Sequence, residues 1–178
     1  MDPITHTCSG ILLGQGLRPL TAVRKTTLLV AGLAAFSPDI DSVSYLWGAD
    51  AFYRVHHTYT HTLVGLAVVA LVLATIELRW LPSLSFARLL GINLGGGAIH
   101  LCGDMIALWP LHLLWPFSDH DFVLQWTSDF DYAVLAVVVV ATGLSETDGF
   151  QQHALWIIAG AFVLLVAYFL LIPGWGAA

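Results

Sequence analysis

The sequence predicts an all-α protein: a polytopic membrane helix bundle of four to five membrane helices, with a metal site near one membrane face. Two observations predict the bundle. Hydrophobic residues make up 58% of the chain and charged residues only 10%, with a mean hydropathy of +0.81, whereas soluble domains carry about 25% charged residues. The apolar residues also fall in long uninterrupted runs. A third observation predicts the site, because the histidines and aspartates gather in a few short motifs.

The apolar runs divide the chain into six helical segments. A hydrocarbon core of ~30 Å needs roughly 20 apolar residues per helical crossing, so 178 residues form a single integral membrane domain over residues 1–178. The expected helices lie at about residues 4–17, 21–36, 62–78, 89–109, 132–144 and 154–172.

Each segment has its own justification. The first is short and rich in small residues. The second ends at Ser37-Pro38, because proline disfavours helical geometry in the residue before it. The third is a clean apolar run, and the fourth contains Gly95-Gly96-Gly97, where a neighbouring backbone can approach closely. The last two are separated by the polar stretch 145–152.

Basic residues predict the orientation. Lysine and arginine are enriched in cytoplasmic loops, and an alternating path puts five of the six on one side: Arg18, Arg24, Lys25, Arg79 and Arg88. The opposite side holds only Arg54. The chain is therefore expected in the plasma (inner) membrane as a multi-pass protein. A net charge of −6 leaves no basic patch, so nucleic-acid binding is not expected.

The same topology brings histidines and aspartates from five separate stretches to the extracytoplasmic face. They are His6, Asp39, Asp41, His56, His57, His61, His100, Asp104 and Asp131. Ionisable residues at membrane depth are costly and indicate a functional site. His100 and Asp104 are four apart and share one helical face. His57 and His61 have the same spacing, whereas His56 would need a turn to reach His61, and the residues alone favour neither. Imidazole and carboxylate ligands suit zinc, manganese or iron.

Simpler interpretations exist for single members of this set. Asp39 or Asp41 in Ser-Pro-Asp-Ile-Asp-Ser would serve equally as a helix cap, worth ~1 kcal/mol. His100 and Asp104 would also serve as a hydrogen-bonded pair between helices. The coincidence of all the motifs on one face favours metal binding.

These motifs, in their order, resemble the YdjM-type family of membrane-bound, metal-dependent hydrolase-like proteins. The resemblance covers about residues 3–131. It rests on Ile-Thr-His (4–6), Ser-Pro-Asp-Ile-Asp-Ser (37–42), His-His-Thr-Tyr-Thr-His-Thr (56–62), His100-x-x-x-Asp104 and Leu-Trp-Pro-Phe-Ser (114–118). The family pattern implies His56 and His61 as the ligands of the third motif, with His57 where arginine is common. A more distant similarity links these motifs to the superfamily of zinc-dependent phospholipase C and single-strand nucleases.

Together, residues and resemblance imply a phospholipase-like, metal-dependent hydrolase. One or two divalent ions are expected, with zinc favoured and manganese or iron as alternatives. The expected ligands are His6, Asp39, His56, His61, His100 and Asp104, with Asp41 and Asp131 as further ligands or supporting residues. A metal-activated water would attack an ester of a membrane lipid or lipid-linked substrate, and Asp41 is the expected catalytic base.

Other classes remain open. A non-catalytic protein would use the ions only to hold its helices together. A diiron membrane oxygenase is less favoured, because its histidine boxes contain more histidine and less aspartate. A transporter is also compatible with an apolar bundle.

Overall fold

The computed structural model describes residues 1–17 and 24–171, which are all-helical apart from their connections. The elements run α1 (Pro3–Gly16), α2 (Arg24–Phe36), η2 (Ser37–Trp47), α3 (Ala49–Val55), α4 (Leu63–Trp80), α5 (Phe86–Ile106), α6 (Tyr132–Glu146), η3 (Gln151–His153) and α7 (Ala154–Leu171). The predicted all-α class is confirmed. Arg18, residues 21–23 of the second predicted helix and residue 172 of the last lie outside the described residues.

The predicted helices are found within about three residues of their expected bounds, but residues 37–55 differ. They were expected to be a loop and instead form η2 and α3. Pro38 opens η2, an eleven-residue 3-10 helix. Because this helix has three residues per turn, Pro38, Asp41 and Ser44 share one face, and all three are buried. Asp39 is buried beside them.

Three helices of the described chain are long and apolar enough to cross a membrane: Leu63–Trp80, Phe86–Ile106 and Gln151–Leu171. The apolar helix Tyr132–Glu146 is shorter. The expected number of four to five membrane helices stays a prediction.

Helices α1, α2 and α5 pack closely through glycine. A Cβ at Gly10 of α1 would lie 2.3 Å from the carbonyl oxygen of Ala31 in α2, and one at Gly96 of α5 would lie 2.6 Å from Cβ of Ala34. Neither position has room for a larger side chain. The close helix approach predicted from Gly95-Gly96-Gly97 is found at Gly96. This close packing places the first turns of α1 beside the second half of α5.

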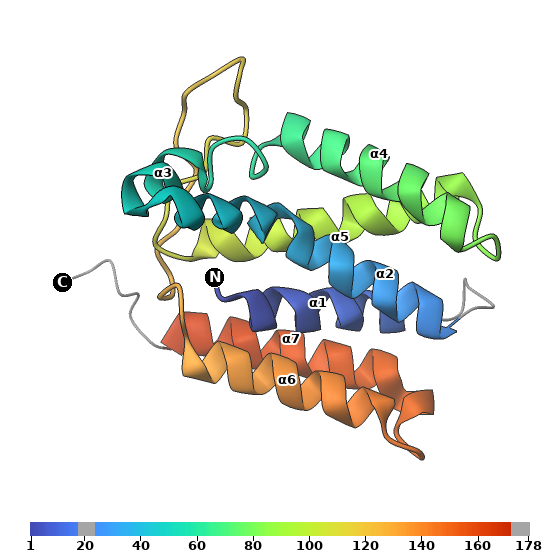
Figure 1. Ribbon diagram of the computed structural model, residues 1–178. Helices are drawn as coiled ribbons and strands as arrows, with labels where there is room; N and C mark the ends of the chain where they lie inside the picture. Colours follow the sequence, from blue (N-terminus) through green and yellow to red (C-terminus); the bar gives the residue numbers. More distant parts are fainter. Residues whose placement is uncertain (18–23, 172–178) are drawn as a thin grey trace.

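One end of the bundle gathers the irregular chain. Figure 1 shows the N-terminus, η2, α3 and the long connection between α5 and α6 at this end. The opposite end carries polar links between helices: Gln15 of α1 donates to Glu146 of α6 at 2.8 Å, and Arg24 of α2 contacts the same carboxylate.

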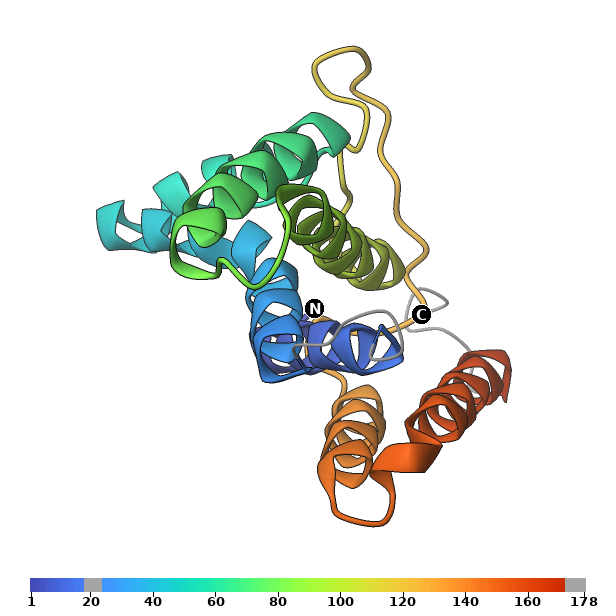
Figure 2. The same cartoon turned by 90° about the vertical axis from the view of Figure 1, so that its right-hand side faces the viewer.

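Helices α6 and α7 form a pair beside α1. Seen along the helices in Figure 2, this pair lies on the side of α1 away from α4. Tyr168 of α7 donates to Asp131 at the start of α6, with an O···O distance of 2.8 Å.

Candidate metal centre

Five histidines and aspartates meet at the end of the bundle that carries η2 and α3. The His–Asp cluster consists of His6 from α1, Asp39 from η2, His61 from the turn before α4, and His100 and Asp104 from α5. All five side chains are buried, His61 and His100 with no exposed surface. The structure thus brings together residues that span almost a hundred positions of sequence.

His100 is held by the end of α2. Its Nδ1 lies 2.6 Å from the carbonyl oxygen of Ala35, one of the terminal helix carbonyls that lack an intrahelical partner. A carbonyl only accepts, so Nδ1 carries the proton and Nε2 presents a lone pair. That Nε2 lies 2.9 Å from Oδ2 of Asp104, one helical turn away. In metal sites, a ligating histidine commonly donates its other ring N–H to a carbonyl or carboxylate, as Nδ1 of His100 does to Ala35.

His61 is oriented by Asp41. The Asp41 Oδ2 atom lies 3.3 Å from His61 Nδ1 and also accepts from the Thr60 hydroxyl at 2.6 Å. The opposite ring nitrogen, Nε2, faces the cluster, 3.0 Å from Nε2 of His100 and 3.6 Å from Oδ1 of Asp39. Two imidazoles therefore direct the same nitrogen at one point.

His6 completes the cluster from α1. Its Nε2 lies 3.0 Å from Oδ1 of Asp104, and its ring stacks on that of His100 with centroids 3.7 Å apart. The amine of Met1 also donates to Asp104 Oδ1, at 2.5 Å. Asp2 caps α1 by accepting from the backbone amides of Ile4 and Thr5, and so sets the start of the helix that carries His6.

Within the described part of the chain, one oxygen of each carboxylate in the cluster is left without a hydrogen bond. Among the described residues, Asp39 Oδ2 and Asp104 Oδ2 are buried without a hydrogen-bond partner. A buried carboxylate oxygen without a hydrogen bond is costly. A divalent cation would satisfy these oxygens and the imidazole lone pairs, so the residues fit a metal ion.

Three groups of possible ligands have their ligand atoms within 4.8 Å of one another. Two of them share His100: the first is His6, Asp39 and His100, and the second is His61, His100 and Asp104. The third adjoins them through His61 and consists of His56, His57 and His61. The His–Asp cluster thus offers one centre of mixed oxygen and nitrogen ligands. A neighbouring group of three imidazoles shares His61 with it.

The charges of the outer residues follow from their contacts. Burial by itself would lower the pKa of His61, but its bonds to Asp39 and Asp41 raise that pKa to about 9. Burial raises the pKa of Asp39, whereas its bond to His61 and the charge of His100 outweigh this effect and lower it. The pKa of His57 falls to about 3, first through burial and then through the charge of His61. Without metal, His61 is therefore protonated at neutral pH, and its positive charge is stabilised by the carboxylates of Asp39 and Asp41.

Asp41 supports two histidines and belongs to none of the three groups. Besides His61 and Thr60, it contacts Nδ1 of His56 at 2.7 Å. Burial would raise its pKa, but the bonds to His56, His61 and Thr60 hold it well below the usual range. Such a carboxylate is a weak base, and its contacts are those of a supporting residue, which was one of the roles expected for Asp41; its roles as catalytic base or ligand stay predictions.

Asp131, expected as a further ligand or supporting residue, lies at the start of α6. Its Oδ1 accepts from the backbone amides of Ala133 and Val134 and caps α6, and its Oδ2 accepts from Thr127 and Tyr168. Neither oxygen is left for a metal, and Asp131 belongs to none of the three groups. Its carboxylate is occupied as a helix cap.

Residues 56–62 form turns and not a helix, so helical spacing does not decide between His56 and His57. His57 has a φ of 66°, which is uncommon for a residue other than glycine. Both rings contact His61, with centroid distances of 5.2 Å for His56 and 4.4 Å for His57. His57 was not among the expected ligands, although it belongs to one of the three groups. The contact between His100 and the backbone carbonyl of Ala35 could not be expected from the sequence, because a backbone carbonyl has no side chain to mark it.

Comparisons with known proteins agree with the resemblance in the motifs. The family model described as YdjM inner membrane protein matches residues 1–175. The chain is 24% identical over 177 residues to the uncharacterized protein YfhP of Bacillus subtilis (strain 168), covering 96% of this chain and 53% of that protein. The chain thus spans about half the length of this relative. No solved structure matches.

Proposed function

Because this chain belongs to the YdjM inner membrane protein family, we propose that it is a metal-dependent hydrolase of that membrane, acting on an ester of a lipid or lipid-linked substrate. The observation that carries the proposal is the convergence of two buried imidazole nitrogens on buried oxygens of Asp39 and Asp104 that make no hydrogen bond of good geometry within the described chain. Such an arrangement supports binding of a cation.

The His–Asp cluster would hold the first ion, and the imidazole group of His56, His57 and His61 would hold a second. This mixture of neutral nitrogen and carboxylate oxygen favours zinc, with manganese and iron as alternatives. When bound, such ions supply an activated water at neutral pH and stabilise the charge on a leaving oxygen. The chain itself fixes the rings, through the Ala35 carbonyl at His100 and through Asp41 at His61.

A small cavity gives this region an opening. It has a volume of about 160 Å³ and is lined by Phe52, Tyr53, His56, His57 and Trp109, among others. The ring of His57 is neutral there, because its lowered pKa keeps it deprotonated. The polar end of a substrate would meet the second histidine group through this cavity.

The proposed face is the extracytoplasmic one. In Figure 1, α2 and α5 begin, and α4 ends, at the end of the bundle opposite η2 and α3. Arg24, Lys25, Arg79 and Arg88 therefore lie at the end away from the cluster, and basic residues favour the cytoplasmic side. Measuring the accessibility of single cysteines at both ends in whole cells tests this orientation.

The purified full chain tests the function directly. We expect one to two zinc ions per chain by elemental analysis, and metal-dependent release of headgroup, phosphate or fatty acid from a panel of phospholipids and lipid-linked phosphates. Chelation should stop the release and zinc should restore it. Bound metal without hydrolysis on the whole panel would instead support a protein that uses metal only for stability, and iron with redox activity would support an oxygenase.

Metal affinity should rise with pH. His61 has a folded pKa of about 9, above its ordinary value, so an ion must displace its proton at neutral pH. The carboxyls of Asp39 and Asp41 stay ionised because their pKa values are lowered. Release of one proton implies that apparent affinity increases about tenfold per pH unit up to about pH 9. Chelator competition at several pH values measures this slope, and a flat profile would contradict a ligand role for His61.

A further inference from the structure

Two adjoining cavities form one long groove along the bundle, which we call the α1–α5–α7 groove. Their volumes are about 410 Å³ and 330 Å³. Five residues line both: Ser9, Ile99, Val138, Phe162 and Leu165. Most of its lining residues come from α1 and α5 on one side and from α6 and α7 on the other, and in Figure 2 α7 stands apart from α5. No lining side chain within the described part of the chain is charged.

One end of the groove lies against the His–Asp cluster. Met1, Thr5 and Gly103 line this end, and the latter two directly precede His6 and Asp104 in the chain. A Cβ at Gly103 would lie 3.1 Å from Cε1 of His6, so the groove wall and the cluster are in contact here. The amine of Met1 reaches from this wall to Asp104. An apolar chain in the groove would therefore end beside the candidate metal ligands.

The groove runs along most of α1 and α7. On α1 its lining runs from Thr5 to Gly16, which at about 1.5 Å per residue is roughly 17 Å. On α7 the lining runs from Leu155 to Phe169, roughly 21 Å, which is more than half of a ~30 Å hydrocarbon core. Trp126 lines the end near the cluster and is half-exposed, and tryptophan is enriched at the level of lipid headgroups. The groove thus runs from headgroup level past the middle of the bilayer, and its far end at Gly16 lies beside Gln15.

From this geometry we infer that the α1–α5–α7 groove binds one acyl chain of a membrane lipid and holds the polar end of that lipid at the His–Asp cluster. The inference rests on the proposed function in one respect: it names the substrate of the hydrolase as an acyl lipid whose headgroup lies on the cluster side of the membrane. Acyl-chain binding itself needs no metal. The lipid enters sideways from the bilayer, between α5 and α7, and brings its headgroup ester to the cluster.

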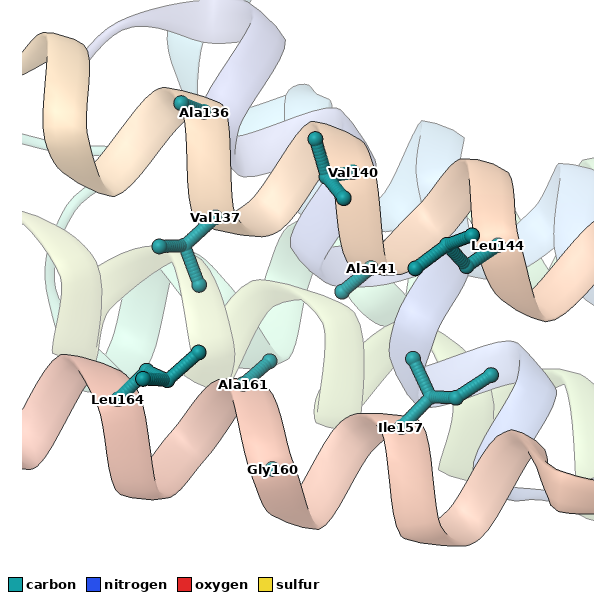
Figure 3. A pocket seen from close by; sticks show the side chains of 9 residues that line it. All are labelled: Ala136, Val137, Val140, Ala141, Leu144, Ile157, Gly160, Ala161 and Leu164. Carbon is teal, nitrogen blue, oxygen red and sulfur yellow. The ribbon is translucent and has the colours of Figure 1, made fainter.

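A second apolar cavity provides a matched control. It has a volume of about 450 Å³, lies between α6 and α7 and is lined by residues such as Val137, Val140 and Leu164 (Figure 3). None of its lining residues belongs to the His–Asp cluster or directly adjoins one of its members in the chain. A lipid chain in this cavity would contact the protein without reaching the cluster.

The test uses the full chain in vesicles of phosphatidylglycerol, a small fraction of which carries a photoreactive diazirine in one acyl chain. Leu165→Trp fills the middle of the groove, and Gly160→Phe fills the control cavity, where a Cβ meets nothing within 4 Å. We expect labelling of α1 and α5 peptides in the wild type and in Gly160→Phe. In Leu165→Trp this labelling should fall at least about tenfold, because several methylenes lose their burial. Metal content should be equal in all three.

A variant at the far end adds a readout that misfolding would not produce. At Gly16 a Cβ would lie 3.9 Å from Cδ1 of Ile158, an ordinary van der Waals distance, so the side chain in Gly16→Leu begins without a backbone clash and shortens the groove. Labelling and turnover should then shift towards lipids with shorter acyl chains, while short-chain lipids react as in the wild type.

The outcomes separate the two proposals. Labelling as expected without hydrolysis of any lipid would leave the groove standing and overturn the hydrolase. Hydrolysis with labelling that is unchanged in Leu165→Trp would overturn the groove alone. Crosslinks that join two copies through α1 and α5 would show that a second chain fills the groove, and would also overturn the inference.

Discussion

Replacing His100 with alanine is expected to remove bound metal and reduce hydrolysis more than about 100-fold, the upper end for residues that merely orient a ligand. His100 belongs to both groups that contain a carboxylate, so no complete mixed centre remains without it. The change also leaves the Ala35 carbonyl without its partner. Elemental analysis and the lipid panel measure the two losses.

Two further variants separate metal loss from misfolding. His100→Gln keeps a side-chain amide that can donate to the Ala35 carbonyl but supplies no imidazole, so it should remain folded and still lose metal. His153→Ala makes the same substitution at an exposed histidine beyond the opposite end of α6, and should bind metal normally. Full metal content and activity in either His100 variant would refute the assignment of the centre.

Gly65→Ala should shift the turns of residues 56–62, which carry His56, His57 and His61, without replacing any of these histidines. A Cβ at Gly65, in the first turn of α4, would lie 1.9 Å from the carbonyl oxygen of Tyr59 and 3.0 Å from Cα of Thr60. Both atoms are backbone, so residues 56–62 must shift and take His61 with them. We expect metal affinity to fall at least about tenfold and stability to fall by about 1–3 kcal/mol, as for other overpacked sites.

The matched control is Gly91→Ala in α5, where a Cβ would meet nothing within 4 Å. Alanine is a better helix former than glycine by about 1 kcal/mol, so this variant should be as stable as the wild type or more so. Metal titration and thermal unfolding in detergent compare the two. Unchanged metal affinity in Gly65→Ala would show that the turn does not position His61.

The helices were predictable because apolar runs are local. A run of about twenty apolar residues predicts a helix wherever it packs, and α4, α5 and α7 appear where the runs predict them. Residues 37–55 were not predictable in this way, because η2 and α3 are short and are stabilised by contacts with distant parts of the chain. Burial of Asp39 and Asp41 on η2 depends on His56 and His61, which follow α3 in the chain.

The membership of the cluster followed largely from the sequence, because topology carries five of the expected residues to one end of the bundle. The roles within it did not. Asp41 and Asp39 are two residues apart in the same motif, yet Asp39 faces the cluster while Asp41 holds histidines from behind. Asp131 was expected at the site and caps α6 instead. Which carboxylate meets a cation depends on side-chain direction, and motif spacing does not specify that direction.

The sequence by itself determined that this is an all-helical protein with apolar helices long enough for a bilayer and a concentration of histidine and aspartate at one end, since composition and periodicity are properties of the chain. Only the tertiary structure decided which nitrogens and oxygens converge, that the Ala35 carbonyl and Asp41 orient two of the rings, and that a groove leads away from the cluster. These features depend on distances between atoms far apart in sequence, and packing of α1, α2, α5 and α7 sets those distances.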